Sequence, residues 1–196
     1  MRKLTLLVAT VAIMVVSGCA NSTALIKANN SSTRSDIFEQ ISTGGVVPSG
    51  YADLRISSSL KTHKPGIYSS KDLHGTPEYK LLANIDGQAI QLQGAPHEED
   101  SESNGVRDTE VGEGTRYRFI ANLRLRAGTH KVVLALPADD LAVERQITLT
   151  EGSSNSLILE PVYRQSPGKR RPGFYGVTSY KEGIKGIRLI LNDNLM

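Results

Sequence analysis

From residue 51 onward the chain alternates apolar and polar positions in short runs, and Gly, Pro, Asn or Asp residues separate the runs. A period of two places successive side chains on opposite faces of a strand, whereas an amphipathic helix has a period near 3.6. The pattern therefore predicts an all-β domain, an antiparallel sandwich of about seven or eight strands. The predicted strands cover residues 53–60, 79–85, 88–92, 116–126, 130–136, 143–150, 156–162 and 187–192.

Two details of this pattern make local predictions. Asp86-Gly87 lies between two apolar runs, and this dipeptide favours a two-residue type I′ hairpin turn, in which both central residues have positive φ. In residues 116–126 the alternation of arginines with apolar residues is interrupted at Ile120-Ala121. Such an interruption predicts a β-bulge in this strand.

The first 18 residues have the properties of a cleaved signal peptide. Arg2 and Lys3 give a positive start, and residues 4–16 form an apolar run that is short for a membrane-spanning helix. The next residues, Val16-Ser17-Gly18-Cys19, resemble the lipobox of bacterial lipoproteins. The resemblance implies cleavage before Cys19 and lipidation of this residue, with a diacylglyceryl group on its sulfur and a further acyl chain, such as palmitate, on its amino group.

The same resemblance implies a location in the cell. In Gram-negative lipoproteins an Asp after the cysteine usually retains the protein in the inner membrane, so Ala20 implies transport to the outer membrane. Three acyl chains hold a protein stably in a bilayer, because each buried methylene contributes about 0.8 kcal/mol. The domain is then expected to face the periplasm or the cell surface.

Composition excludes several classes of protein. Cys19 is the only cysteine of the 196 residues, so no intramolecular disulfide and no zinc cage of several thiolates is possible. Without residues 1–18 the chain has 21 basic and 20 acidic residues, a net charge of +1. This balance does not support nucleic-acid binding.

Residues 19–50 are rich in Asn, Ser, Thr and Gly, which predicts a flexible tether between the lipidated cysteine and a domain that covers residues 51–196. Within the tether, residues 35–41 are expected to form one or two helical turns, with Ser35 as the N-cap and Phe38 and Ile41 on one face.

Residues 95–114 contain seven acidic residues and one arginine, which predicts a mobile, solvated loop. His97, Glu98, Glu99 and Asp100 offer ligands to a divalent cation, but the ligand spacing of a calcium loop is missing. Neither a metal site nor a cofactor is therefore predicted, and the favoured interpretation of the acidic segment is solvation.

Basic residues gather on one predicted strand. Arg116, Arg118, Arg124 and Arg126 point outward in the alternation and form a possible anion-binding face. The alternative, which we favour, is a solvated face, because charged outward positions also keep a half-buried strand soluble. A second basic cluster, at residues 169–171, contains only three charges.

No catalytic residue is predicted. The four histidines are scattered along the chain, and no metalloprotease, serine-hydrolase or phosphate-loop motif occurs. His130 lies in the same alternation as Val132 and Leu134. This position predicts a core histidine with satisfied hydrogen bonds rather than a general base, which would need an orienting partner.

Residues 123–159 resemble the PEGA-type surface-associated module of bacterial envelope proteins and, more loosely, carboxypeptidase-regulatory-like and transthyretin-like sandwiches. The similar features are the turn and strand at residues 127–130, the turn at Glu151-Gly152 and the apolar strand at residues 157–159, with the hairpin at residues 85–88. The PEGA tetrapeptide itself is absent. The resemblance implies an immunoglobulin-like or transthyretin-like sandwich and no catalytic residue.

Together these observations predict an outer-membrane lipoprotein whose β-sandwich binds an envelope partner, either a protein or a polysaccharide, without catalysis. A periplasmic metal-dependent or hydrolytic enzyme with an unrecognised site is the alternative.

Overall fold

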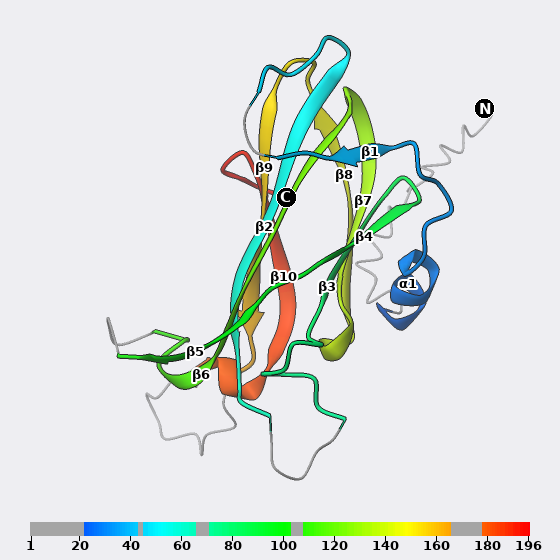
Figure 1. Ribbon diagram of the computed structural model, residues 1–196. Coiled ribbons are helices and arrows are strands. Elements are labelled where there is room, and N and C mark those ends of the chain that lie inside the picture. Colours follow the sequence, from blue (N-terminus) through cyan, green and yellow to red (C-terminus); the bar gives the residue numbers. More distant parts are fainter. Residues whose placement is uncertain (1–21, 43–44, 66–70, 103–107, 166–177) are drawn as a thin grey trace, which may run out of the picture.

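The computed structural model describes residues 22–42, 45–65, 71–102, 108–165 and 178–196. Two β-sheets face each other, and their long strands run along the length of the molecule (Figure 1). The all-β prediction is therefore confirmed. The predicted signal peptide, the lipobox with Cys19 and the basic cluster at residues 169–171 lie outside the described residues.

In the part of the chain that the structure describes, the larger sheet has seven strands and the smaller sheet has four. In spatial order the larger sheet contains β1 (Phe38–Gln40), β6 (Gly112–Arg126), β2 (Tyr51–Thr62), β9 (Ser154–Tyr163), β10 (Ile184–Leu191) and β11 (Asn194–Leu195), and β5 (Pro96–Ser101) also pairs with β6. The smaller sheet contains β4 (Gln88–Leu92), β3 (Leu81–Ile85), β7 (Gly128–Leu136) and β8 (Leu141–Leu149). The helical elements are α1 (Ser22–Asn29) and the 3₁₀ turns η1 (Pro137–Asp139) and η2 (Tyr180–Glu182).

Among the described residues, all strand pairs are antiparallel except β2 and β9, which run parallel, with Asp53 opposite Ser154 and Ser58 opposite Leu159. The expectation of a purely antiparallel sandwich was wrong at this pair. The chain crosses between the sheets from β8 to β9, so no hairpin fixes the direction of β9 relative to β2.

The core lies between the sheets and is formed by alternate side chains of the strands. On β6 the buried aliphatic and aromatic residues all have odd numbers, among them Tyr117, Phe119 and Leu123. The register of β6 with β2 is continuous from Thr115 to Arg126. The predicted bulge at Ile120-Ala121 was therefore wrong, because Ile120 is simply an apolar residue on the outer face, where half of its surface is exposed (50%).

The Asp86-Gly87 hairpin is confirmed, with φ of 48° at Asp86 and 95° at Gly87. The Asp86 carboxylate also attaches the turn to β7, because it accepts the Lys131 amide at 2.8 Å and contacts His130 Nδ1 at 2.7 Å. The other ring nitrogen of His130 lies 2.8 Å from the Arg126 carbonyl oxygen. His130 is buried, so the prediction of a core histidine with satisfied hydrogen bonds is also confirmed.

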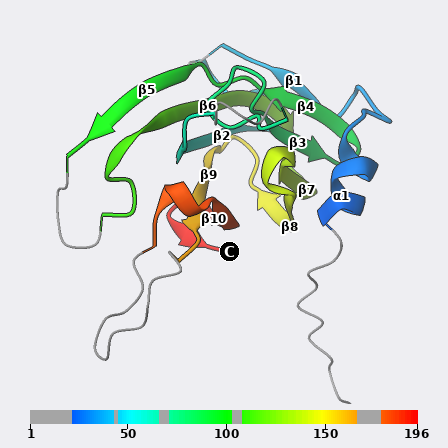
Figure 2. The same cartoon turned by 90° about the horizontal axis from the view of Figure 1, so that it is seen from below.

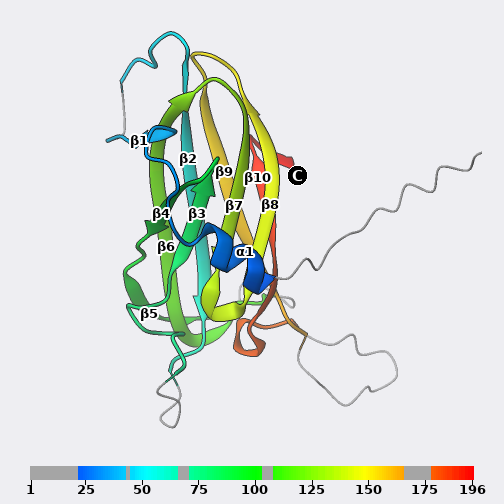
Figure 3. The same ribbon diagram turned by 90° about the vertical axis from the view of Figure 1, so that its right-hand side faces the viewer.

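Part of the predicted tether, residues 19–50, packs against the sheets instead: residues 22–29 form α1 and residues 38–40 form β1. Helix α1 lies across β7 and β8 on the outer face of the smaller sheet (Figure 3). There Thr23 Oγ1 donates to Asp140 Oδ1 at 2.8 Å, and Val133 and Ala135, which point away from the core, are buried. The apolar run of β7 is thus covered on both faces, which explains why it does not alternate.

Residues 38–40, expected to be helical, form strand β1, which pairs with β6. The side-chain oxygen of Gln88 accepts the amides of Ile37 and Phe38 at 2.8 and 3.1 Å. These contacts hold the backbone in an extended form, and Phe38 is buried against the core. Packing against the sandwich has overridden the weak helical preference of this short segment.

The acidic segment 95–114 is also not a single loop. Residues 96–101 form β5, which runs beside the first half of β6 at the rim of the larger sheet (Figure 2). Several of the acids have a basic partner: Glu99 pairs with Arg116, and Lys64 pairs with Glu98 at 3.1 Å and with Glu113. The loop was predicted because the acidic side chains repel one another. Basic side chains offset this repulsion, so a strand of this composition is stable here.

Within the described part of the chain, no helix has the length and apolar character needed to span a bilayer.

Candidate functional site

The best candidate site lies at the end of the sandwich where β2 ends and η1 follows β7, at the bottom of Figure 1. The segment after β2 supplies His63, Asp72 and His74, and η1 supplies Asp139. The site therefore joins the larger sheet to a corner of the smaller one.

Local turn chemistry places these side chains. Asp72 Oδ1 accepts the backbone amide of His74 at 3.0 Å, which is an Asx-turn and brings the two side chains together. Gly75 has a φ of 75°, and a Cβ atom at this position would lie 2.4 Å from Pro65 Cδ. The segment is fixed to the core by Tyr117, whose hydroxyl donates to the Thr76 carbonyl at 2.6 Å.

The side chains form a continuous chain of hydrogen bonds. His63 Nε2 lies 2.7 Å from Asp72 Oδ2, and His74 Nδ1 lies 2.6 Å from Asp72 Oδ1. On its other side, His74 Nε2 lies 3.2 Å from Asp139 Oδ1, and the Tyr79 hydroxyl donates to Asp139 Oδ2 at 2.6 Å. One imidazole is thus held between two carboxylates.

This arrangement changes the ionisation of its members. Burial lowers the pKa of His74, but hydrogen bonds to Asp139 and Asp72 more than offset this effect, so the pKa is raised above 6.5. Burial likewise opposes ionisation of Asp72, but hydrogen bonds from His63 and His74 lower its pKa to about 2. Burial, reinforced by Asp139, raises the pKa of the Tyr79 hydroxyl. The cluster therefore favours positive charge at His74 and negative charge at Asp72.

The sequence contains only a weak signal for this site. Asp72-Leu73-His74 places a carboxylate and an imidazole two residues apart, a spacing that turn chemistry brings together. His63 is nine residues before Asp72, and Asp139 is 65 residues after His74. Their approach depends on the packing of the two sheets, so periodicity and motifs do not reveal it.

A second polar cluster lies under β5 and surrounds the buried side chain of Lys61. Its ammonium group donates to the Glu110 carbonyl at 3.0 Å, to the Gly112 carbonyl and to Ser101 Oγ at 3.1 Å. Arg116 pairs with both Glu99 and Glu110, and Glu110 accepts the Tyr163 hydroxyl at 2.7 Å.

Each donor of the Lys61 ammonium has an acceptor, and the two nearby glutamates, Glu99 and Glu110, are paired with Arg116. The pKa of Glu99 is lowered to about 2, chiefly by the hydrogen bond from Arg116 and also by that from Ser101. Burial lowers the pKa of Lys61, against the attraction of Glu99. We therefore assign this cluster a structural role, namely to attach β5 to the sheet.

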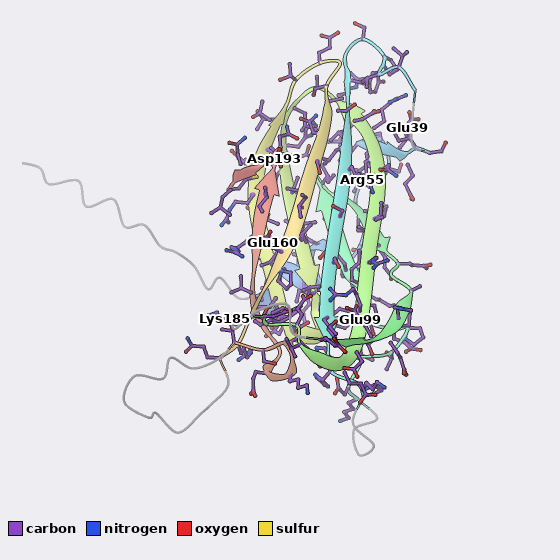
Figure 4. All side chains as sticks on the ribbon, turned by 90° about the vertical axis from the view of Figure 1, so that its left-hand side faces the viewer. Glu39, Arg55, Glu99, Glu160, Lys185 and Asp193 are labelled. Carbon is purple, nitrogen blue, oxygen red and sulfur yellow. The ribbon has the colours of Figure 1, made fainter. Side chains whose placement is uncertain are left out.

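The four arginines predicted as an anion-binding face lie on the outer face of β6 but differ in environment. Arg116 pairs with two glutamates, and Arg124 pairs with Asp53 at 2.7 Å, so both are neutralised within the chain. Arg118 and Arg126 are exposed and form no ion pair among the described residues. Figure 4 shows the same outer face, with Arg55 and Glu160 on neighbouring strands. Anion binding stays a prediction, and of the four predicted arginines Arg118 and Arg126 are the two without an ion pair among the described residues.

The possible cation ligands at residues 97–100 do not converge. Glu98 and Glu99 pair with Lys64 and Arg116, and His97 is exposed on β5. The structure instead brings together His63 and His74, two histidines for which the sequence predicts no common site.

Comparison of the chain with protein-family models, with curated proteins and with solved structures gives no match.

Proposed function

We propose that this protein is an outer-membrane lipoprotein, anchored through acylated Cys19, whose β-sandwich is a non-catalytic binding or structural module for an envelope protein or polysaccharide. The observation that carries the proposal is the Val16-Ser17-Gly18-Cys19 sequence after a charged and apolar leader. Its cysteine is the only one in the chain, so lipidation accounts for a residue that a disulfide cannot use.

The described fold supports a close attachment to the membrane. Only residues 20 and 21 lie between Cys19 and α1, and α1 packs on the smaller sheet. Three extended residues span at most about 10 Å. An acylated Cys19 would therefore hold the sandwich next to the bilayer, and not at the end of a flexible tether of thirty residues.

The outer face of the larger sheet is the surface that we propose for the partner. It carries Arg55 and Arg118 on adjacent strands and the exposed side chain of Ile120 between polar neighbours. Unpaired arginines favour an acidic partner, such as an anionic polysaccharide or an acidic protein surface. The PEGA-like interpretation remains part of this proposal, because it accounts for a surface module without catalysis.

The alternative, a periplasmic metal-dependent or hydrolytic enzyme, has one supporting observation, the group formed by His63, Asp72 and His74. Histidine and carboxylate are ligands of catalytic metals.

The anchor is tested by Cys19→Ser in the full chain, expressed with its own leader. We expect the wild-type protein to appear in the outer-membrane fraction at the size that lacks residues 1–18, and the variant to lose this mature, membrane-bound form, because serine has no thiol to acylate. Ser17→Ala, which keeps a small residue in the lipobox, is the control and should behave as the wild type. Recovery of mature-size Cys19→Ser protein in the membrane would contradict the proposal.

A further inference from the structure

We propose that His63, Asp72 and His74 form a binding site for one divalent transition-metal ion, best suited to Zn²⁺. One potential ligand atom from each residue lies within 4.8 Å of the other two. Two imidazoles and one carboxylate are a donor set that suits zinc, whereas calcium and magnesium prefer oxygen ligands alone. This inference does not depend on the lipid anchor.

The distances leave little rearrangement for metal binding. Asp72 lies between the two rings, 2.7 Å from His63 Nε2 and 2.6 Å from His74 Nδ1. Ligand atoms of a tetrahedral zinc ion, each about 2.1 Å from the metal, lie about 3.4 Å apart. Each ring nitrogen and the Asp72 oxygen that it contacts therefore need to separate by about 0.8 Å, and ligand atoms of the two rings already lie within 4.8 Å of each other. The ion takes the place of the protons that the rings and the carboxylate now share. The His63 side chain is 35% exposed, so it has room to move.

The surroundings of His74 match the support that a metal-bound histidine requires. When a ring binds a metal through one nitrogen, the other N–H usually donates to a carboxylate or carbonyl, which fixes the orientation of the ring. Here His74 Nε2 faces Asp139 Oδ1 at 3.2 Å, and the Tyr79 hydroxyl holds the other oxygen of Asp139. This leaves His74 Nδ1, on the Asp72 side, for the ion.

The Asp139–Tyr79 support is also rigid. The Asp139 side chain is only 4% exposed and Tyr79 is buried in the core. The Tyr79 ring packs 5.2 Å from the His74 ring and 4.8 Å from the Tyr117 ring, measured between centroids. The core therefore fixes the position of His74 before a metal arrives, which lowers the entropic cost of binding.

The charge of the cluster favours the same conclusion. Its two carboxylates, when ionised, carry two negative charges, which one protonated histidine only half offsets and one divalent ion offsets fully.

The expected site has three protein ligands and one position left for water or for a donor group of a bound partner. Zinc sites with three protein ligands of this type are characteristic of reactive rather than purely structural zinc. Binding of the ion would also join the end of β2 to the segment before β3 and, through Asp139, to the corner after β7. Both the chemistry and the stability of this end of the sandwich would then depend on metal.

The test uses the full chain with Cys19→Ser, purified in detergent and treated with a chelator, so that the only thiol does not compete for metal. Zn²⁺ should bind with a 1:1 stoichiometry in calorimetry and raise Tm by about 5–10 °C when present at about a hundredfold excess over its dissociation constant. Co²⁺ should give the visible absorption bands of a tetrahedral site. Ca²⁺ should give no stabilisation.

Two variants locate the site. His74→Ala and Asp72→Asn should each weaken Zn²⁺ binding at least tenfold and abolish the cobalt bands, whereas His97→Ala, on exposed β5, should bind as the wild type. His63→Ala removes the partly exposed ligand and serves if either of the first variants fails to fold. Absence of cobalt bands and of a zinc-dependent Tm change in the starting protein would overturn the proposal, as would equal stabilisation by Ca²⁺ or an equal loss of binding in His97→Ala.

Discussion

Phe119→Ala is expected to destabilise the protein by about 3–5 kcal/mol, because it leaves a cavity that the packed core cannot fill. Phe119 is fully buried and its ring stacks on that of Tyr117, with 5.8 Å between centroids and 6° between planes. Gly94 packs directly against the ring, since a Cβ at this position would lie 2.8 Å from Phe119 Cε1. Unfolding in urea, followed by circular dichroism, gives the change in free energy.

The control is Ile120→Ala, one residue further along the same strand. Ile120 is 50% exposed on the outer face, so its truncation should cost less than about 1 kcal/mol. Similar losses for both variants would contradict the continuous register of β6 and would favour the bulge that the sequence pattern suggests at this point.

Lys61→Met is expected to destabilise the protein by about 2–4 kcal/mol, although methionine preserves most of the apolar length of the side chain. The carbonyl oxygens of Glu110 and Gly112 and the hydroxyl of Ser101 would lose a charged donor inside the structure. The negative charges of Glu99 and Glu110 would also lose a nearby cation. Thermal unfolding measures the overall loss, and hydrogen exchange should show faster opening of the β5 amides.

Lys185→Met is the matched control, because Lys185 is exposed on β10 (Figure 4). This strand lies toward the opposite edge of the larger sheet from β5. A change below about 0.5 kcal/mol is expected for this surface substitution. If Lys61→Met were as stable as the wild type, the buried ammonium would not attach β5, and the structural role assigned to this cluster would be wrong.

The sequence predicts the strands well where alternation and turn residues agree. The segments around 53–60, 130–136 and 156–162 lie within β2, β7 and β9, and the Asp86-Gly87 turn has the predicted backbone. In each case the information is local: the pattern of one strand, or the φ preference of two residues.

The errors arise where distant residues decide the local structure. Residues 38–40 are extended because Gln88 binds their backbone, and β5 is a strand because Arg116 and Lys64 neutralise its acids. The sequence around each segment contains none of these partners. The cluster of His63, His74 and Asp139 was missed for the same reason, since the packing of the two sheets brings its members together.

Mass spectrometry of the N-terminal peptide of the membrane-extracted protein tests the central proposal most directly. We expect a chain that begins at Cys19, lacks residues 1–18 and has the additional mass of a diacylglyceryl group and one amide-linked acyl chain. A peptide that retains the leader, or one that begins after it with an unmodified Cys19, would contradict the lipid anchor and with it the placement of the sandwich against the outer membrane.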